Sequence, residues 1–429
     1  MSDHTHNELA AAAQRADVVV VGAGVIGAAT AYELAKRDLN VVVIDRNDVG
    51  HGCSFGNAGW ITPAFAMPLP MPGLLLKSLK WMCDPNSPLY IKPRANLELV
   101  RWLWRFMRCM NEPAARRAAA ALAELARHSL DTYKQLDARQ PGAFGFTQQG
   151  LLAVARTAEG LDAVTHEVEL IEPLGVRAEL LDAQSVRNRE PAVICRELAG
   201  GVFFPDEAHA EPLATVQSLA RFATDHGAQF FTGVELAGFD VTGRRVDALI
   251  TTRGRLPFTG QLVLATGSWS NALGKCLGLR VPILAGKGYH AIIDPMQPMP
   301  ASPMYLVERK VGVTPRDGSI RLAGTLELVD AQDDSITMRR VHALVRGARE
   351  YLPLPDPTPL RQIWRGLRPC TPDGVPIIGR PPTLDNLTLA CGHQMLGLLC
   401  APATALLAAQ LVTGDNPSFD PAPFRADRF

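Results

Sequence analysis

The first half-hundred residues carry the clearest alternation of hydrophobic and polar segments in the chain. Residues 18–21 are four consecutive valines, and such an unbroken β-branched run is typical of a parallel strand buried on both faces. Residues 25–37 then place Ile26, Ala29 and Leu34 on one face of a helix. A second apolar run follows at residues 41–44. The pattern predicts a strand, a helix and a second strand that together form one βαβ unit.

Three glycines occupy the turn between the first strand and the helix. Gly22, Gly24 and Gly27 have the G-x-G-x-x-G spacing, which allows a tight turn, close approach of a pyrophosphate, and close helix–strand packing. The phosphates would lie on the helix N-terminus, where free N–H groups favour an anion. Asp45 ends the second strand, where a carboxylate can accept the hydroxyls of an adenosine ribose. These features predict a dinucleotide site and leave FAD and NAD both open.

The rest of the chain alternates between helical and strand-like segments. Residues 97–110 form a basic amphipathic pattern, with Leu97, Val100 and Trp104 on one face and arginines on another. We interpret this segment as an ordinary packed helix with a solvated arginine face; contact with a membrane surface is the alternative. Further helices are predicted at residues 114–134, 335–352 and 398–412, and strands at residues 229–236, 245–252, 261–267, 281–294 and 305–325.

Composition narrows the class of protein. The 429 residues contain 43 Lys plus Arg and 43 Asp plus Glu, so no global charge attracts nucleic acid. The eight cysteines form no C-x-x-C pair, which argues against a zinc site and favours a reducing cytoplasm. Residues 1–14 lack a basic segment followed by a long apolar core, so we expect a disordered leader and not a signal peptide. The expected location is cytoplasmic, with a peripheral position on the inner face of a membrane as the alternative.

Several short motifs together resemble the D-amino-acid oxidase superfamily of flavoenzymes. The N-terminal unit resembles that superfamily's FAD signature, residues 264–267 (LATG) resemble its mid-chain strand end, and residues 366–379 (GLRPCTPDGVPIIG) resemble its C-terminal signature. Within the superfamily, the motifs at residues 54–59, 77–82, 286–289 and 392–393 are most similar to bacterial D-amino-acid dehydrogenases. The resemblance extends over nearly the whole chain.

The resemblance implies an α/β fold with two interleaved domains. A doubly wound, Rossmann-like FAD domain would comprise residues 15–62, 191–284 and 359–429. An α+β substrate domain, built on an antiparallel or mixed sheet, would comprise residues 63–190 and 285–358.

The resemblance also implies which residues contact FAD. The loop at residues 53–59 would line the flavin by backbone approach, and the segment at residues 392–397 would pass under its pyrimidine ring. Asn57 stands where one subgroup of relatives has the histidine that attaches flavin covalently, so the FAD is expected to be non-covalent. The implied cofactor contacts are Gly22, Gly24, Val25, Ile26, Gly27, Asp45, Arg46, Cys53, Ser54, Gly56, Asn57, Ala58, Gly59, Val234, Thr266, Gly267, Trp269, Gly366, Gly392, His393 and Gly397.

In the same resemblance, Arg368 would be the clamp for a substrate carboxylate, because its planar fork can form two parallel charge-assisted hydrogen bonds. Tyr289 and His290 are weaker candidates for the substrate pocket. Oxidases of the superfamily often carry a second carboxylate-binding tyrosine where this chain has residues 311–313 (VGV). Tyr289 or Tyr305 could replace that tyrosine.

The implied activity is FAD-dependent oxidation of a D-amino acid at Cα, through an imino acid, to a 2-oxo acid. Electrons would pass to a quinone or another carrier. Alternatives within the superfamily are an oxidase that forms hydrogen peroxide and an enzyme for cis-4-hydroxy-D-proline or another secondary amine. A flavin-binding electron-transfer subunit without substrate chemistry is the alternative from another class.

Overall fold

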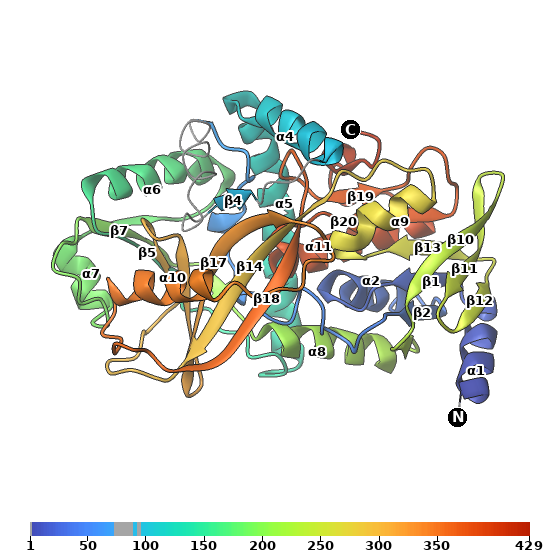
Figure 1. Ribbon diagram of the computed structural model, residues 1–429, viewed down its shortest axis with the longest axis horizontal. Coiled ribbons are helices and arrows are strands. Elements are labelled where there is room, and N and C mark those ends of the chain that lie inside the picture. Colours follow the sequence, from blue (N-terminus) through green and yellow to red (C-terminus); the bar gives the residue numbers. More distant parts are fainter. Residues whose placement is uncertain (1, 73–88, 92–95) are drawn as a thin grey trace.

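The computed structural model describes residues 2–72, 89–91 and 96–429, and the motif at residues 77–82 lies outside the described residues. Two large sheets dominate the molecule, one in each half of Figure 1. The mixed α/β fold class predicted from the sequence is confirmed.

The first sheet contains the predicted βαβ unit. Its strands, in spatial order, are β19 (Ile377–Gly379), β20 (Leu387–Cys391), β13 (Gln261–Leu264), β1 (Val18–Val21), β2 (Val41–Ile44) and β9 (Gln229–Phe231). All neighbours are parallel except β19 and β20. The valines of β1 alternate between two hydrophobic cores because successive side chains of a strand point to opposite faces.

Helices cover one face of this sheet and a small sheet covers the other. Val18 and Val20 pack in a core with residues of four helices: α2 (Val25–Ala35), α5 (Glu112–Arg139), α8 (Pro212–Asp225) and α11 (Gly397–Thr413). Val19 and Val21 face a three-stranded sheet made of β10 (Leu236–Thr242), β11 (Arg245–Thr251) and β12 (Gly254–Pro257).

The N-terminal segment is not a disordered leader, so that prediction is wrong. Ser2–Arg15 forms helix α1, which lies beside β12 at the edge of the molecule (Figure 1). Leu9, Ala12 and Ala13 are buried in the core that also contains Leu256. Tertiary burial of three apolar side chains therefore orders a segment whose sequence is mostly polar.

The second sheet has nine strands and is mostly antiparallel. Its order is β18 (Leu360–Cys370), β14 (Leu284–Ile293), β17 (Ser319–Val329), β16 (Val311–Arg316), β15 (Met304–Leu306), β5 (Leu151–Ala155), β7 (Gly200–Phe204) and β6 (Glu179–Asp182), and β4 (Leu89–Ile91) pairs with β17. Strands β7 and β18 belong to this sheet, although the expected segments placed them in the FAD domain. The two-stranded pair of β3 (Trp60–Ile61) and β8 (Ala208–His209) lies apart from both large sheets.

Helices also flank the second sheet. Helix α10 (Met338–Arg349) covers one face of β14, while α6 (Ala158–Ile171) and α7 (Ala183–Arg189) pack beside β7. The face of the sheet opposite α10 lies against the loop that follows β2. Thr314 of β16 donates a hydrogen bond to the carbonyl of Ala58 in this loop at 2.9 Å. The loop is therefore held between the two large sheets.

Helix α4 (Leu97–Cys109) is confirmed, but the expected packing face is wrong. Leu99 and Trp102 are buried, and the Trp102 indole N–H donates to the carbonyl oxygens of Pro282 and Cys370 at 3.1 and 3.2 Å. The apolar residues predicted to pack against the core are instead exposed to solvent. Their exposed fractions are 62% for Leu97, 59% for Val100 and 53% for Trp104. Within the described residues, no helix is long and apolar enough to cross a bilayer.

Candidate cofactor and substrate site

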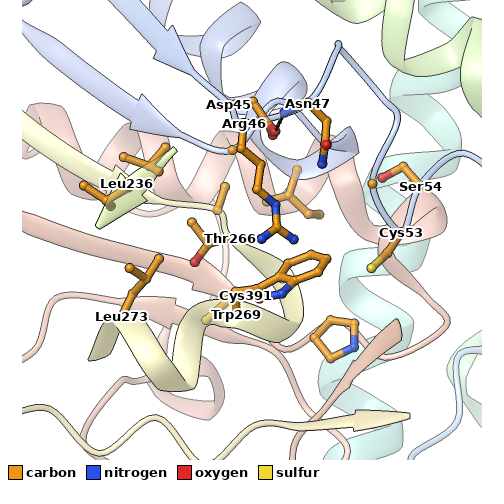
Figure 2. A pocket seen from close by; sticks show the side chains of 18 of the residues that line it. Asp45, Arg46, Asn47, Cys53, Ser54, Leu236, Thr266, Trp269, Leu273 and Cys391 are labelled. Atoms are coloured by element: carbon orange, nitrogen blue, oxygen red, sulfur yellow. Dashed lines mark hydrogen bonds between the residues drawn. The ribbon is translucent and has the colours of Figure 1, made fainter. Parts of the chain in front are cut away.

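A cavity of about 360 Å³ begins at the carboxyl ends of β1 and β2 and runs toward the N-terminus of α11. This is the edge at which open α/β sheets bind ligands. Figure 2 shows Asp45 and Arg46 at the end of β2, with Thr266 and Trp269 across the cavity and Ser54 farther along the loop.

The glycine turn has the conformation that its spacing predicts. Gly22 has a φ of +108°, which disfavours any residue with a Cβ, and a Cβ at Gly27 would collide with the Gly22 carbonyl. Gly24 precedes α2 and provides no side-chain cap, and the Val25 N–H instead donates to Ser54 Oγ at 3.0 Å. The N-terminus of α2 therefore presents N–H groups and a positive dipole end to the cavity, as a pyrophosphate site requires.

Asp45 lies at the predicted ribose position. One carboxylate oxygen accepts from the Ala23 N–H at 2.7 Å. The other accepts from the Asn47 N–H at 2.8 Å (Figure 2). Across the cavity, the Arg46 guanidinium lies over the Trp269 ring, 4.1 Å from its centroid. Acid, arginine and indole thus surround the end of the cavity nearest β2, where the adenosine half of a dinucleotide fits.

The other end of the cavity lies between the loop after β2 and the start of α11. Gly397 and Leu398 line it, and α11 has no side-chain N-cap, so its positive end is also available to a ligand. His393 bonds to the Thr404 hydroxyl at 2.9 Å, and burial lowers its pKa to about 3, so its ring is neutral. Two helix N-termini whose own N-cap residues provide no side-chain cap therefore face one elongated cavity.

Most of the expected cofactor contacts line this cavity. They are Gly22, Gly24, Val25, Ile26, Asp45, Arg46, Cys53, Ser54, Asn57, Val234, Thr266, Gly267, Trp269, His393 and Gly397. The others do not line it. They are Gly27, Gly56, Ala58, Gly59, Gly392 and Gly366, of which Gly366 lines a neighbouring cavity of about 550 Å³.

Sequence reasoning missed several lining residues. Asn47, Glu235, Gln332, Pro369 and Gln394 all contribute to the wall. Gln394 directly follows the expected Gly392 and His393, so its position in the motif was an available signal. Asn47 and Glu235 likewise follow the expected contacts Arg46 and Val234, whereas Pro369 on β18 and Gln332 in a loop reach the cavity only through the tertiary fold.

Arg368 lies on the face of β14 and β18 that is turned toward the loop after β2. Its guanidinium occupies the space over Gly288, where any Cβ would overlap it, so the glycine at this position makes room for the side chain. The guanidinium donates to the Thr325 carbonyl, and among the described residues no carboxylate pairs with it. Burial lowers the pKa of Arg368, the direction expected for a desolvated cation.

His290 and Tyr289 point to opposite faces of β14. His290 Nδ1 bonds to the Gly56 carbonyl at 2.9 Å, and its ring stacks on Trp364. Burial lowers the pKa of His290 to about 4, which keeps the ring neutral. Tyr289 instead donates to Glu327 at 2.7 Å within the core under α10, so it lies outside the cavity.

Tyr305 also lies outside the cavity. It packs edge to face on Trp60 and Phe65 in a separate hydrophobic cluster, and Lys310 lies 5.4 Å from its ring centroid. Arg368 and His290 also lie outside the lining of the 360 Å³ cavity, so a second carboxylate-binding tyrosine stays a prediction.

Comparison with known proteins agrees with this geometry. Residues 17–411 match the family model described as FAD dependent oxidoreductase. The chain is 32% identical to a D-amino acid dehydrogenase of Granulibacter bethesdensis over 96% of this chain and 99% of that protein. It is 34% identical to a D-amino acid dehydrogenase of Methylobacterium nodulans over 93% of this chain and 96% of that protein.

Solved structures show the same fold. Glycine oxidase from Geobacillus kaustophilus superposes with a TM-score of 0.77 at 24% identity, covering 97% of this chain and 99% of that one. L-proline dehydrogenase from P. horikoshii gives a TM-score of 0.76 at 20% identity, with 97% and 98% covered. With a full-length family match and a cavity shaped for a dinucleotide, the chain belongs to the FAD-dependent oxidoreductase family.

Proposed function

We propose that this protein oxidises D-amino acids at Cα, with Arg368 holding the substrate carboxylate. The observation that carries the proposal is the partly buried guanidinium of Arg368, for which the described residues provide a carbonyl oxygen and no counter-charge. Desolvating a cation without an anionic partner is costly, and a substrate carboxylate would supply that partner. The relatives named D-amino acid dehydrogenase support the choice of substrate class.

In the proposed reaction, bound FAD supplies the hydride acceptor. The substrate loses a hydride from Cα and a proton from nitrogen, and the imino acid then hydrolyses to a 2-oxo acid and ammonia. Arg368 orients the substrate through two hydrogen bonds, so that one C–H bond points in a fixed direction. The neutral ring of His290 holds the loop at Gly56. The positive end of α11 favours negative charge at its end of the cavity.

We propose that FAD is bound without a covalent link. Cys53 is the one cysteine in the loop lining the cavity, and burial raises the pKa of its thiol to about 11, so it is a poor nucleophile. The Asn57 side chain is already hydrogen-bonded within the protein. Its Nδ2–H donates to the Met395 carbonyl, and its Oδ1 accepts from the Gly59 N–H. Acid precipitation should therefore release all flavin into the supernatant, whereas yellow precipitated protein would contradict the proposal.

The proposed activity is tested by anaerobic bleaching of the flavin. D-amino acids, their L-enantiomers and cis-4-hydroxy-D-proline are each added to the yellow protein without oxygen. Bleaching by D-amino acids alone supports the proposal, whereas bleaching by cis-4-hydroxy-D-proline alone would assign the secondary-amine activity. Absence of bleaching with every compound would contradict an amino-acid oxidising function.

We further propose that the electrons pass to a quinone, with α4 on the inner face of a membrane. The stripe of Leu97, Val100, Trp104 and Met107 is exposed, and Arg101 and Arg108 flank it on the same helix. Apolar side chains beside arginines are typical of helices that lie on anionic lipid. Such a position would bring the reduced enzyme to a membrane-dissolved acceptor.

Flotation with anionic vesicles tests this position. Trp104→Glu should release the protein from vesicles that bind the unchanged protein, because it places a charge in the apolar stripe. Ile194→Glu is the matched control, since Ile194 is 54% exposed outside α4. Equal flotation of both variants would contradict a role for α4.

A further inference from the structure

Gln394, in the turn between β20 and α11, has a buried amide for which the described part of the chain provides no hydrogen-bond partner. Its side chain lines the cofactor cavity and the residue is 5% exposed. Among the described residues, neither its Oε1 nor its Nε2 has a hydrogen-bond partner. A buried polar group left unpaired costs about 1–3 kcal/mol. A ligand that supplies both a donor and an acceptor would remove that cost.

The backbone fixes the position of this amide. Gln394 has a φ of +52°, and its N–H donates to the carbonyl of Pro369 at 3.1 Å. It lies three residues before Gly397, where α11 begins. The turn therefore holds Gln394 at the α11 end of the cavity, opposite the end that contains Asp45.

The two ends of the cavity match the two halves of FAD. The adenosine half fits at Asp45, and the pyrophosphate fits at the N-terminus of α2. The flavin ring must then extend toward α11. Its pyrimidine edge presents an N–H donor between two carbonyl acceptors, and the positive helix end favours the charge that develops beside this edge on reduction.

We infer that Gln394 binds the pyrimidine edge of the flavin through both atoms of its amide. A carboxamide offers one acceptor and one donor side by side, which complements an N–H beside a carbonyl. Other polar side chains near this end are already committed: His393 to Thr404, and both amide atoms of Asn57 to the backbone. Gln394 fixes the ring in its plane and, by donating to a flavin carbonyl, favours the reduced cofactor.

Titration of FAD-free protein with FAD tests this inference without any substrate. Gln394→Leu should weaken FAD binding about tenfold, the equivalent of about 1.4 kcal/mol. Gln394→Gly removes the amide while tolerating the left-handed backbone, and should weaken binding by a similar factor. Gln217→Leu is the matched control because Gln217 is an exposed glutamine on α8 that does not line the cavity; it should leave affinity unchanged. Circular dichroism of the FAD-free variants checks folding.

The flavin midpoint potential gives a second readout. Gln394→Leu should make the potential more negative by removing a donor, and Gln394→Glu should make it more negative still by adding a negative charge. Unchanged affinity and potential in the Leu and Gly variants would overturn the inference. A raised substrate KM in those variants, with FAD affinity unchanged, would assign the amide to the substrate and equally overturn it. Because FAD titration requires no turnover, this result does not depend on whether D-amino acids are oxidised.

Discussion

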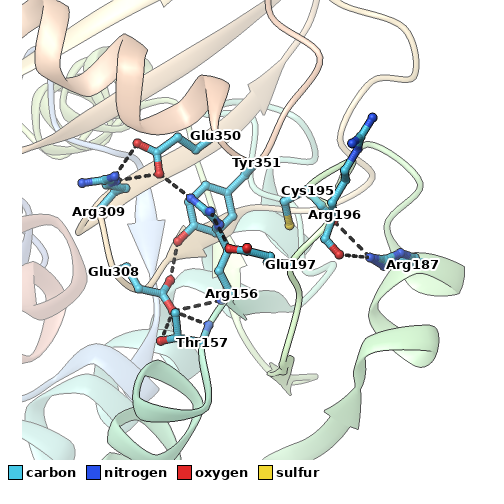
Figure 3. Close-up of polar contacts among 10 residues, drawn as sticks. All are labelled: Arg156, Thr157, Arg187, Cys195, Arg196, Glu197, Glu308, Arg309, Glu350 and Tyr351. Atoms are coloured by element: carbon cyan, nitrogen blue, oxygen red, sulfur yellow. Dashed lines mark hydrogen bonds and ion pairs between the residues drawn. The ribbon is translucent and has the colours of Figure 1, made fainter.

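Two polar regions of the molecule differ in how completely their groups are paired. In the substrate half, Glu308 accepts hydrogen bonds from the Tyr351 hydroxyl and from the N–H groups of Arg156 and Thr157 (Figure 3). Nearby, Glu350 pairs with the side chains of Arg156 and Arg309. In that network, Arg156 Nε is the one buried side-chain atom without a partner among the described residues, whereas in the other region both amide atoms of Gln394, at the cofactor cavity, and Nε2 of His290, on β14, are unpaired.

We interpret the groups of the Glu308 network as structural, and the unpaired groups of Gln394 and His290 as groups whose hydrogen-bond partners come from a bound ligand. Burial raises the pKa of Glu308, but hydrogen bonds from Tyr351 and Thr157 outweigh it, and the net pKa is lowered. The hydrogen bonds of this network therefore stabilise the ionised form of Glu308. At the cavity, no such compensation exists within the described chain, so the missing partners are expected to come from the cofactor and the substrate.

The largest expected effect is that of Arg368→Leu. It removes both donors to the substrate carboxylate, and kcat/KM for D-amino acids should fall about 10²- to 10⁴-fold. FAD content should remain normal, and Arg368→Lys should restore activity only in part, because a point charge lacks the planar fork. Arg361→Leu is the control on the same strand, where the guanidinium pairs with Asp294 at the surface. Near-normal kcat/KM in Arg368→Leu would show that another group holds the carboxylate.

Glu308→Gln tests the paired region. It removes the charge that accepts four hydrogen bonds, so the free energy of unfolding should fall by about 2–3 kcal/mol in denaturant titration. FAD affinity should not change. Glu197→Gln, at a carboxylate 79% exposed, should have little effect on either quantity. A loss of FAD affinity in Glu308→Gln without loss of stability would contradict the division between the two regions.

Asp45→Ala should weaken FAD binding roughly tenfold or more, because it removes a charge-assisted ribose contact of about 1.5–3 kcal/mol. It also removes the acceptor for the Ala23 N–H in the glycine turn. Asp48→Ala, at an exposed acid just beyond the strand, is the control. Equal affinities for the two variants in fluorescence titration would place the ribose elsewhere.

The last expected effect depends on pH. Burial raises the pKa of Glu207 to about 8, and its Oε2 has no partner among the described residues. Between its ordinary pKa of 4.5 and 8 the folded state binds more protons than the unfolded state, so this carboxyl reduces stability as pH rises. Glu207→Gln should therefore gain stability relative to the unchanged protein from pH 5 to pH 8 in urea unfolding. A constant difference across this range would contradict the raised pKa.

Local patterns predicted the nucleotide end of the site. The four valines of β1, the glycine spacing and Asp45 lie within thirty residues, and each depends on neighbours in sequence. Helix α1 could not be predicted in the same way, because Leu9 is buried by strands more than two hundred residues later. Its own segment gives no periodic signal strong enough to indicate that contact.

The substrate side was less predictable for a different reason. Every residue of β14 is buried, so alternation of polar and apolar positions does not reveal which face His290 and Tyr289 occupy. Gln394 carries no charge and belongs to no periodic pattern. Its importance follows from the absence of partners among the described residues, which only packing reveals.

The strand order of the first sheet has a consequence for biosynthesis. Strand β1 pairs with β13, and β13 with β20, so the glycine fingerprint leaves the ribosome long before its neighbours exist. At about 5–20 residues per second, β20 follows β2 by a delay on the order of tens of seconds. The wall of the cofactor cavity is complete only when residues 393–398 have been translated. Loading of FAD therefore has to follow nearly complete synthesis, and the nascent chain must keep its early valine strands from aggregating until then.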